Sequence, residues 1–137
     1  MRNDCSFSDC RKYRYSLLHQ WDELFERRRA IFVCLNPSTA DENQLDPTLR
    51  RIKAFSKRLG ASEFLMLNIF AYRATDPKEM LAVKDPIGPE NDGHIQAALS
   101  EAYELNKGQL DVVGGWGHHG LHICLLYTSD AADEYDR

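Results

Sequence analysis

The chain has 137 residues, of which 43% are apolar and 28% charged, and its formal net charge at pH 7 is −4. This length suits one domain with a hydrophobic core. No apolar stretch is long enough to span a bilayer, and the N-terminal segment lacks the apolar centre of a signal peptide. We therefore expect a cytoplasmic protein with no membrane partner, whose four cysteines are free thiols.

The first half of the chain predicts two strands and a helix. "KYRYSLLHQW", residues 12–21, has the aromatic and apolar content of a strand. The unbroken apolar run 30–35 is typical of a strand buried on both faces. A helix should begin near Asp46, with Pro47 at its first position, and end at Gly60. Its core face at helical spacing is Leu49, Ile52, Phe55 and Leu59.

The second half predicts two more strands and a long helix. A strand spans 63–70, a single helical turn follows Pro77, and a helix spans 91–105. The last strand, in "QLDVVGGWG", begins near Leu110. The helix should bury Ile95, Ala98, Leu99 and Tyr103. This order predicts an α/β fold with a mainly parallel sheet of about four strands flanked by helices, its first strand an antiparallel addition.

Charge is distributed unevenly. Residues 1–60 hold twelve Lys and Arg against eight Asp and Glu, whereas residues 61–123 hold four against nine. A basic half could attract phosphate groups. A mixed, solvated surface explains the same pattern and is the commoner case.

Polar side chains follow all three central strands at their carboxyl ends, which is where ligands bind in open parallel sheets. We therefore predict one shared pocket for a nucleotide or another anionic or heteroaromatic ligand. Trp116 could stack on a ring there. The residues assigned to catalysis are Asn36 and Asp41, and those assigned to binding are Ser38, Thr39, Asn68, Tyr72, Arg73, Asp76, Trp116, His118 and His119.

Each of these segments also has a purely structural explanation. Asn-Pro-Ser-Thr is a good turn sequence, and Thr75 or Asp76 could cap a helix before Pro77. His118 and His119 are adjacent, so their side chains diverge, and Cys5 and Cys10 lack the spacing of a zinc knuckle. We expect no metal and no cofactor.

The motifs "YRYSL", "LNPSTAD", "DPTLRR", "LNIFAYRATDP", "DPIGPEND" and "GGWGHHG" resemble, in order and spacing, the bacterial domain-of-unknown-function family numbered 1643. The resemblance covers about residues 10–120. It implies a small α/β domain of bacteria and their phages and no established activity. Members usually continue with another strand and a motif containing Pro and His.

This chain departs from the family at its end. The segment "CLLYTSDAADE" resembles a translated sequencing adapter. Adapters of this kind are known contaminants of metagenomic short-read assemblies. We therefore expect a single domain over 1–123, a foreign tail over 124–137, and the loss of a C-terminal strand. Such a loss would expose apolar surface and unpaired strand-edge groups.

The strand that ends in Asn-Pro-Ser also resembles, more weakly, the strand-end motif of some uracil-DNA glycosylase-like proteins. This resemblance implies that Asn36 or Asp41 positions a water, that Asn68 reads a base edge, and that the base is flipped into the pocket. The basic helix 47–59 could then track phosphates. Fold analogy does not fix function.

Three hypotheses follow. The first is a nucleotide or nucleic-acid pocket at the strand ends that could hydrolyse base-glycosyl bonds. The second is a non-catalytic module for a small anion or nucleotide, with Arg73 as its anchor. The third is an interaction domain in which the same segments only cap helices and satisfy turns. The sequence leaves the substrate and the oligomeric state open.

Overall fold

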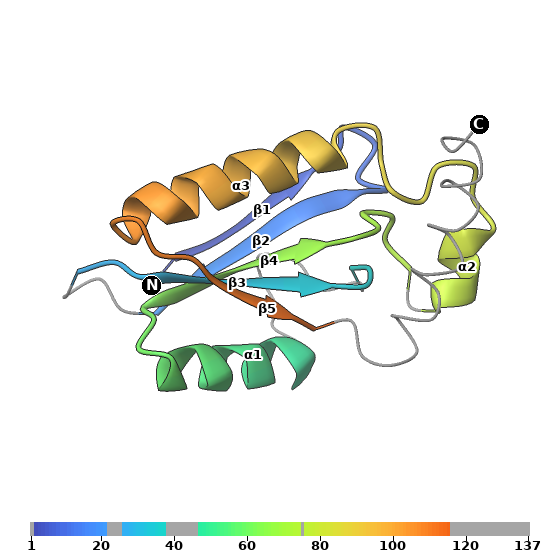
Figure 1. The fold of residues 1–137 in the computed structure, drawn as a ribbon. Coiled ribbons are helices and arrows are strands. Elements are labelled where there is room, and N and C mark those ends of the chain that lie inside the picture. The colour runs from blue at the N-terminus through green and yellow to red at the C-terminus, as the bar shows by residue number, and fades with distance from the viewer. Residues whose placement is uncertain (1, 22–25, 38–46, 75, 116–137) are drawn as a thin grey trace, which may run out of the picture.

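A computed structural model describes residues 2–21, 26–37, 47–74 and 76–115. One sheet lies between two helices, with α3 over one face and α1 over the other (Figure 1). The strands are β1 (Arg2–Phe7), β2 (Arg14–Gln20), β3 (Arg29–Cys34), β4 (Glu63–Asn68) and β5 (Asp111–Gly114). The helices are α1 (Pro47–Arg58), α2 (Pro77–Leu81) and α3 (Asn91–Leu105).

The sheet is mixed, with strand order β1-β2-β4-β3-β5. Strands β3, β4 and β5 are parallel, whereas β1 pairs antiparallel with β2, and β2 pairs antiparallel with β4. The α/β class and the antiparallel β2 are confirmed, but a mainly parallel sheet of about four strands is wrong. The strand that the sequence did not predict is β1. It is a polar edge strand without an apolar pattern, and backbone pairing to β2 stabilises it.

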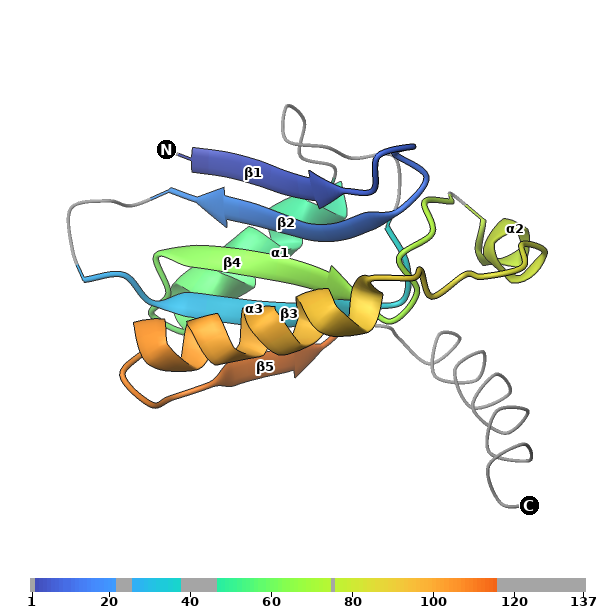
Figure 2. The same cartoon turned by 90° about the horizontal axis from the view of Figure 1, so that it is seen from above.

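The sheet buries a separate apolar cluster on each face. The cluster under α1 includes Leu17, Phe32, Leu49, Phe64 and Met66. The cluster under α3 includes Leu18, Ile31, Leu65, Leu67 and Ala98. From above, α3 lies over β3 and leaves β1 open (Figure 2).

The helix bounds follow the sequence signals, but the predicted core faces are too wide. Helix α1 begins at Pro47, and Gly60 beyond its end has a φ of 81°, which favours glycine. Phe55, Leu59 and Tyr103 were expected in the core but are 42%, 39% and 53% exposed. Phe55 and Tyr103 lie on the flanks of α1 and α3, and Leu59 lies one residue beyond the end of α1.

A bulge changes the direction of side chains at the start of β2. Ser16 pairs with Ser6 and Arg14 with Phe7, so Tyr15 is an extra residue. The Tyr15 ring stacks on His94 of α3 at 4.4 Å, while the Arg14 guanidinium lies on the α1 face, beside Met66. Bulges re-aim side chains in this way, and they are common next to functional sites.

None of the helices in the described part of the chain is long and apolar enough to cross a membrane.

Candidate functional site

The carboxyl ends of β3, β4 and β5 lie at one edge of the sheet (Figure 1). Backbone pairing continues past the strands there: Phe70 N–H donates to the Leu35 carbonyl at 2.9 Å, and Ala74 N–H donates to that of Pro37 at 3.1 Å. The loops after β3 and β4 are thereby fixed together. Asn36 and Asn68 therefore share this edge.

Asn68, the last residue of β4, is completely buried. It is in register with Cys34 of β3, so both side chains lie on the α1 face, where Cys34 joins the core cluster. Neither the oxygen nor the nitrogen of the Asn68 amide has a hydrogen-bond partner within the described part of the chain. Buried amides are almost always bonded, so this one requires an explanation.

Arg14 and Asn91 are two buried polar residues that contact β4 or the loop after it, and neither was singled out from the sequence. Arg14 is 1% exposed, with its Nη2 3.5 Å from the Met66 sulfur. Asn91, at the start of α3, donates through Nδ2 to the carbonyls of Asn68 and Ile69 at 2.9 and 3.1 Å. The available signals were an arginine opening an apolar strand and an Asn at a helix start.

An apolar groove opens on the same face, with a volume of about 230 Å³. The rings of Phe32 and Phe55 meet edge to face in it, with centroids 6.0 Å apart. A Cβ on Gly115 would lie 3.2 Å from the Cys34 sulfur, so glycine keeps the β5 end of the groove open. The lining residues are Phe32, Cys34, Arg51, Ile52, Phe55, Val113 and Gly115.

Asn36 holds the two strand-end loops together. Its Nδ2 donates to the carbonyl of Ala74 at 2.7 Å and to that of Pro37 at 3.3 Å. These bonds match the structural explanation of the Asn-Pro segment, in which the side chain satisfies nearby backbone. Its Oδ1 forms no hydrogen bond with another described residue.

Tyr72 and Arg73, two further residues of the predicted site, contact residues of the segment before β2 and the end of β1. The Tyr72 ring meets that of Tyr13 edge to face at 5.7 Å. Arg73 donates to the Arg11 carbonyl at 3.2 Å and lies over the Phe7 ring at 4.8 Å. None of these contacts involves Asn68.

Asp76 is exposed and caps α2 by accepting a hydrogen bond from the Lys78 N–H at 3.0 Å. This confirms the alternative in which the segment before Pro77 starts a helix. Six of the predicted site residues lie outside the described residues: Ser38, Thr39, Asp41, Trp116, His118 and His119.

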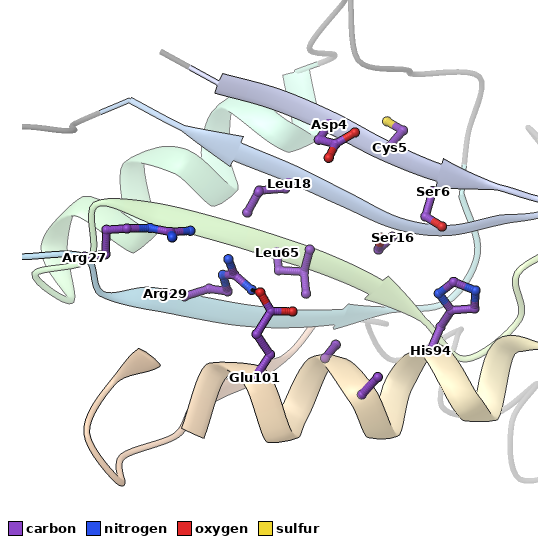
Figure 3. A pocket seen from close by; sticks show the side chains of 12 residues that line it. Asp4, Cys5, Ser6, Ser16, Leu18, Arg27, Arg29, Leu65, His94 and Glu101 are labelled. Carbon is purple, nitrogen blue, oxygen red and sulfur yellow. Dashed lines mark ion pairs between the residues drawn. The ribbon is translucent and has the colours of Figure 1, made fainter. Parts of the chain in front are cut away.

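A second cavity, of about 260 Å³, lies on the α3 face between β1, β2 and α3 (Figure 3). Arg27 and Arg29 reach into it from the start of β3, and Glu101 faces Arg29 from α3. Both arginines bond the fully buried Glu63, with their Nε atoms 2.7 Å from its two carboxylate oxygens.

This arrangement forms an ion cluster at the amino end of β3 and β4. Burial alone would raise the pKa of Glu63, but hydrogen bonds from Arg27 and Arg29 outweigh it and hold that pKa below its ordinary value of 4.5. The arginines are thus paired within the protein. We interpret the cluster as an anchor of the fold rather than a ligand site.

Within the described residues, no three His, Cys, Asp or Glu side chains gather so that they could hold a metal ion. Cys5, Cys10 and Cys34 are reduced cysteines.

Comparison with known proteins found one family. No curated protein and no solved structure matches the chain. Residues 14–128 match the family described as "Protein of unknown function (DUF1643)". The match includes β2 with its bulge, the Asn68 strand end and the groove. The chain therefore belongs to the DUF1643 family.

Proposed function

We propose that the groove between α1, β3 and β5 binds a planar heteroaromatic ring of the nucleobase type, and that Asn68, which is in register with the groove residue Cys34, reads its polar edge. The observation that supports this is the fully buried Asn68 amide, whose oxygen and nitrogen both lack a partner among the described residues. A buried amide left without bonds costs about 1–3 kcal/mol. A ligand that bonds it would offset that cost.

The chemistry of the amide suits a base edge. Asn offers one acceptor oxygen and one NH₂ donor side by side, and nucleobase edges present adjacent donors and acceptors. The apolar walls, with Phe32 and Phe55 among them, favour a flat ring over a free phosphate. The groove volume of about 230 Å³ suits one ring rather than a large cofactor.

Hydrolysis of a base-glycosyl bond extends this proposal. Asn36 and Asp41 are the residues proposed to position a water, and the Asn36 Oδ1 has no hydrogen-bond partner among the described residues. The resemblance to uracil-DNA glycosylase-like proteins supports this extension, because it pairs a water-positioning loop with a base-reading Asn.

Binding without hydrolysis is the second candidate. The observation in its favour is that the Asn36 nitrogen already bonds two backbone carbonyls, which gives this residue a structural task. Arg73, the anchor in the anion-binding form of this hypothesis, donates to the Arg11 carbonyl instead. We therefore place the anchor of the binding module at Asn68.

The test combines binding and turnover. Calorimetry with a panel of nucleoside monophosphates should show saturable binding of at least one base, weakened about 5- to 150-fold in Asn68→Leu, the loss expected for one bidentate base contact. Asn68→Asp should change which base is preferred, because it replaces a donor with an acceptor. The matched control is Gln96→Leu, an exposed position on α3.

Release of free base from a uracil-containing oligonucleotide would support hydrolysis, and binding without release would support the second candidate. If no base or nucleotide binds at low salt, the proposed function is wrong.

A further inference from the structure

We propose that helix α1 is a docking surface for a nucleic-acid strand, so that the ring entering the groove is a base within a polymer and not a free nucleotide. This inference rests on the proposed function for the identity of the ring. The evidence for the docking surface itself is the charge of α1 and its position next to the groove.

Helix α1 carries five cations and no acid in twelve residues. Its buried residues Leu49, Ile52 and Ser56 face the sheet, which turns the cations to the flank and the outer side of the helix. No ion pair joins any of these cations to another described residue. The cations are Arg50, Arg51, Lys53, Lys57 and Arg58, of which all but the half-buried Lys53 are exposed.

The opposite face of the molecule has the opposite sign. Helix α3 contains Asp92, Glu101 and Glu104 and no Lys or Arg. Since α1 and α3 cover different faces of the sheet (Figure 1), a basic helix covers one face and an acidic helix the other. Such a charge distribution orients a polyanion toward α1 during encounter and disfavours binding across α3.

The basic surface is continuous with the groove. Arg51 and Phe55 belong to α1 and also line the groove, so a strand lying along the helix would pass its rim. Twelve helical residues extend about 18 Å. That length covers several phosphates at the spacing of about 3.4 Å along one strand of a duplex.

The crowding of like charges supports an anionic partner. Lys53 and Lys57 lie 5.8 and 5.9 Å from the Trp21 ring, so both amines share one aromatic face. Burial lowers the pKa of Lys53, and the charge of Lys57 lowers it further. A phosphate placed between the two amines would relieve their repulsion.

The test compares two variants that lose equal charge. Arg50→Gln/Arg58→Gln removes two exposed cations from α1 without altering a groove residue. Lys84→Gln/Lys107→Gln removes two exposed cations outside α1. Fluorescence anisotropy would follow the binding of a labelled 20-nucleotide single strand and of its duplex at several salt concentrations, with thermal melts confirming that each variant folds.

We expect tight, salt-dependent binding of at least one nucleic acid by the native chain. The α1 variant should bind at least tenfold more weakly at low salt, and its slope of log affinity against log salt should fall by about 1.4–1.8. The control should stay within about twofold of the native chain.

Equal weakening of both variants, or an unchanged salt slope in the α1 variant, would overturn the docking surface. Tighter binding to vesicles of anionic lipid or to an acidic peptide would also overturn it, because the partner would then differ in class. The proposed function is tested separately: the α1 variant should bind a mononucleotide in the groove as the native chain does, whereas Asn68→Leu should bind it about 5- to 150-fold more weakly.

Discussion

Replacing Asn68 with leucine should make the protein more stable while removing its ligand. Leucine has a similar size and no polar atoms, and the amide that it replaces is 0% exposed with no partner for either polar atom among the described residues. Leaving a buried amide unpaired costs about 1–3 kcal/mol. We therefore expect the free energy of unfolding to rise by about 1–3 kcal/mol.

Asn106→Leu is the matched control, because Asn106 is also buried but fully bonded. Its Oδ1 accepts from the Arg29 N–H at 2.9 Å, and its Nδ2 donates to the Arg29 carbonyl at 2.8 Å. Removing this amide leaves a backbone donor and a backbone acceptor unpaired. Asn106→Leu should therefore lower the free energy of unfolding by about 2–4 kcal/mol.

Urea denaturation followed by circular dichroism measures both changes, provided that the m-value, the slope of the free energy of unfolding against urea concentration, is the same in all three proteins. The reasoning is refuted if Asn68→Leu destabilises the protein as Asn106→Leu does. That outcome would mean that the Asn68 amide is satisfied within the protein and holds the fold together.

Three further predictions concern the ion cluster and the groove. Glu63→Gln should lower the free energy of unfolding at pH 7 by about 3–5 kcal/mol, because the buried Arg29 then keeps only the exposed Glu101, 3.4 Å away, as a carboxylate partner. The denaturation midpoint of the exposed control Glu26→Gln should match the native one. The pKa of Glu63 in the folded protein is below 4.5, so its contribution to the free energy of unfolding is complete above pH 4.5 and falls as the pH drops through the folded pKa. Thermal melts of the native protein at decreasing pH should show this loss of stability. An equal loss in Glu63→Gln would contradict the assignment to Glu63. Gly115→Val should weaken nucleotide binding at least fivefold by calorimetry, since its Cβ would lie 3.2 Å from the Cys34 sulfur, and undiminished binding would show that the ligand does not enter this groove.

The elements with strong local signals were predictable. Strands β3 and β4 each contain a continuous apolar run, residues 30–34 and 64–67, and α3 spans 91–105 as predicted because its pattern and its flanking turns agree. Strand β1 was not predictable, because its sequence is polar and its partner in β2 supplies the backbone pairing. The antiparallel orientation of β2 was expected, but its pairing with β1 likewise depends on tertiary contacts.

The common edge of two candidate site residues was predictable, but their hydrogen bonding was not. Strand-end polarity correctly placed Asn36 and Asn68 at one edge. Which of them bonds backbone and which lacks a partner depends on how the loops after β3 and β4 join, and this leaves no trace in the sequence. The burial of Arg14 follows from the bulge at Tyr15, an irregularity of pairing that side-chain patterns do not encode.

The central claim is that the buried Asn68 amide forms the hydrogen bonds that hold a base. Nuclear magnetic resonance of ¹⁵N-labelled protein tests it most directly, with the Asn68 side-chain NH₂ signals assigned by their absence in Asn68→Leu. On titration with the nucleoside monophosphate that binds best, these signals should move downfield and saturate together with binding. Saturable binding that leaves the Asn68 NH₂ signals unchanged would contradict the claim.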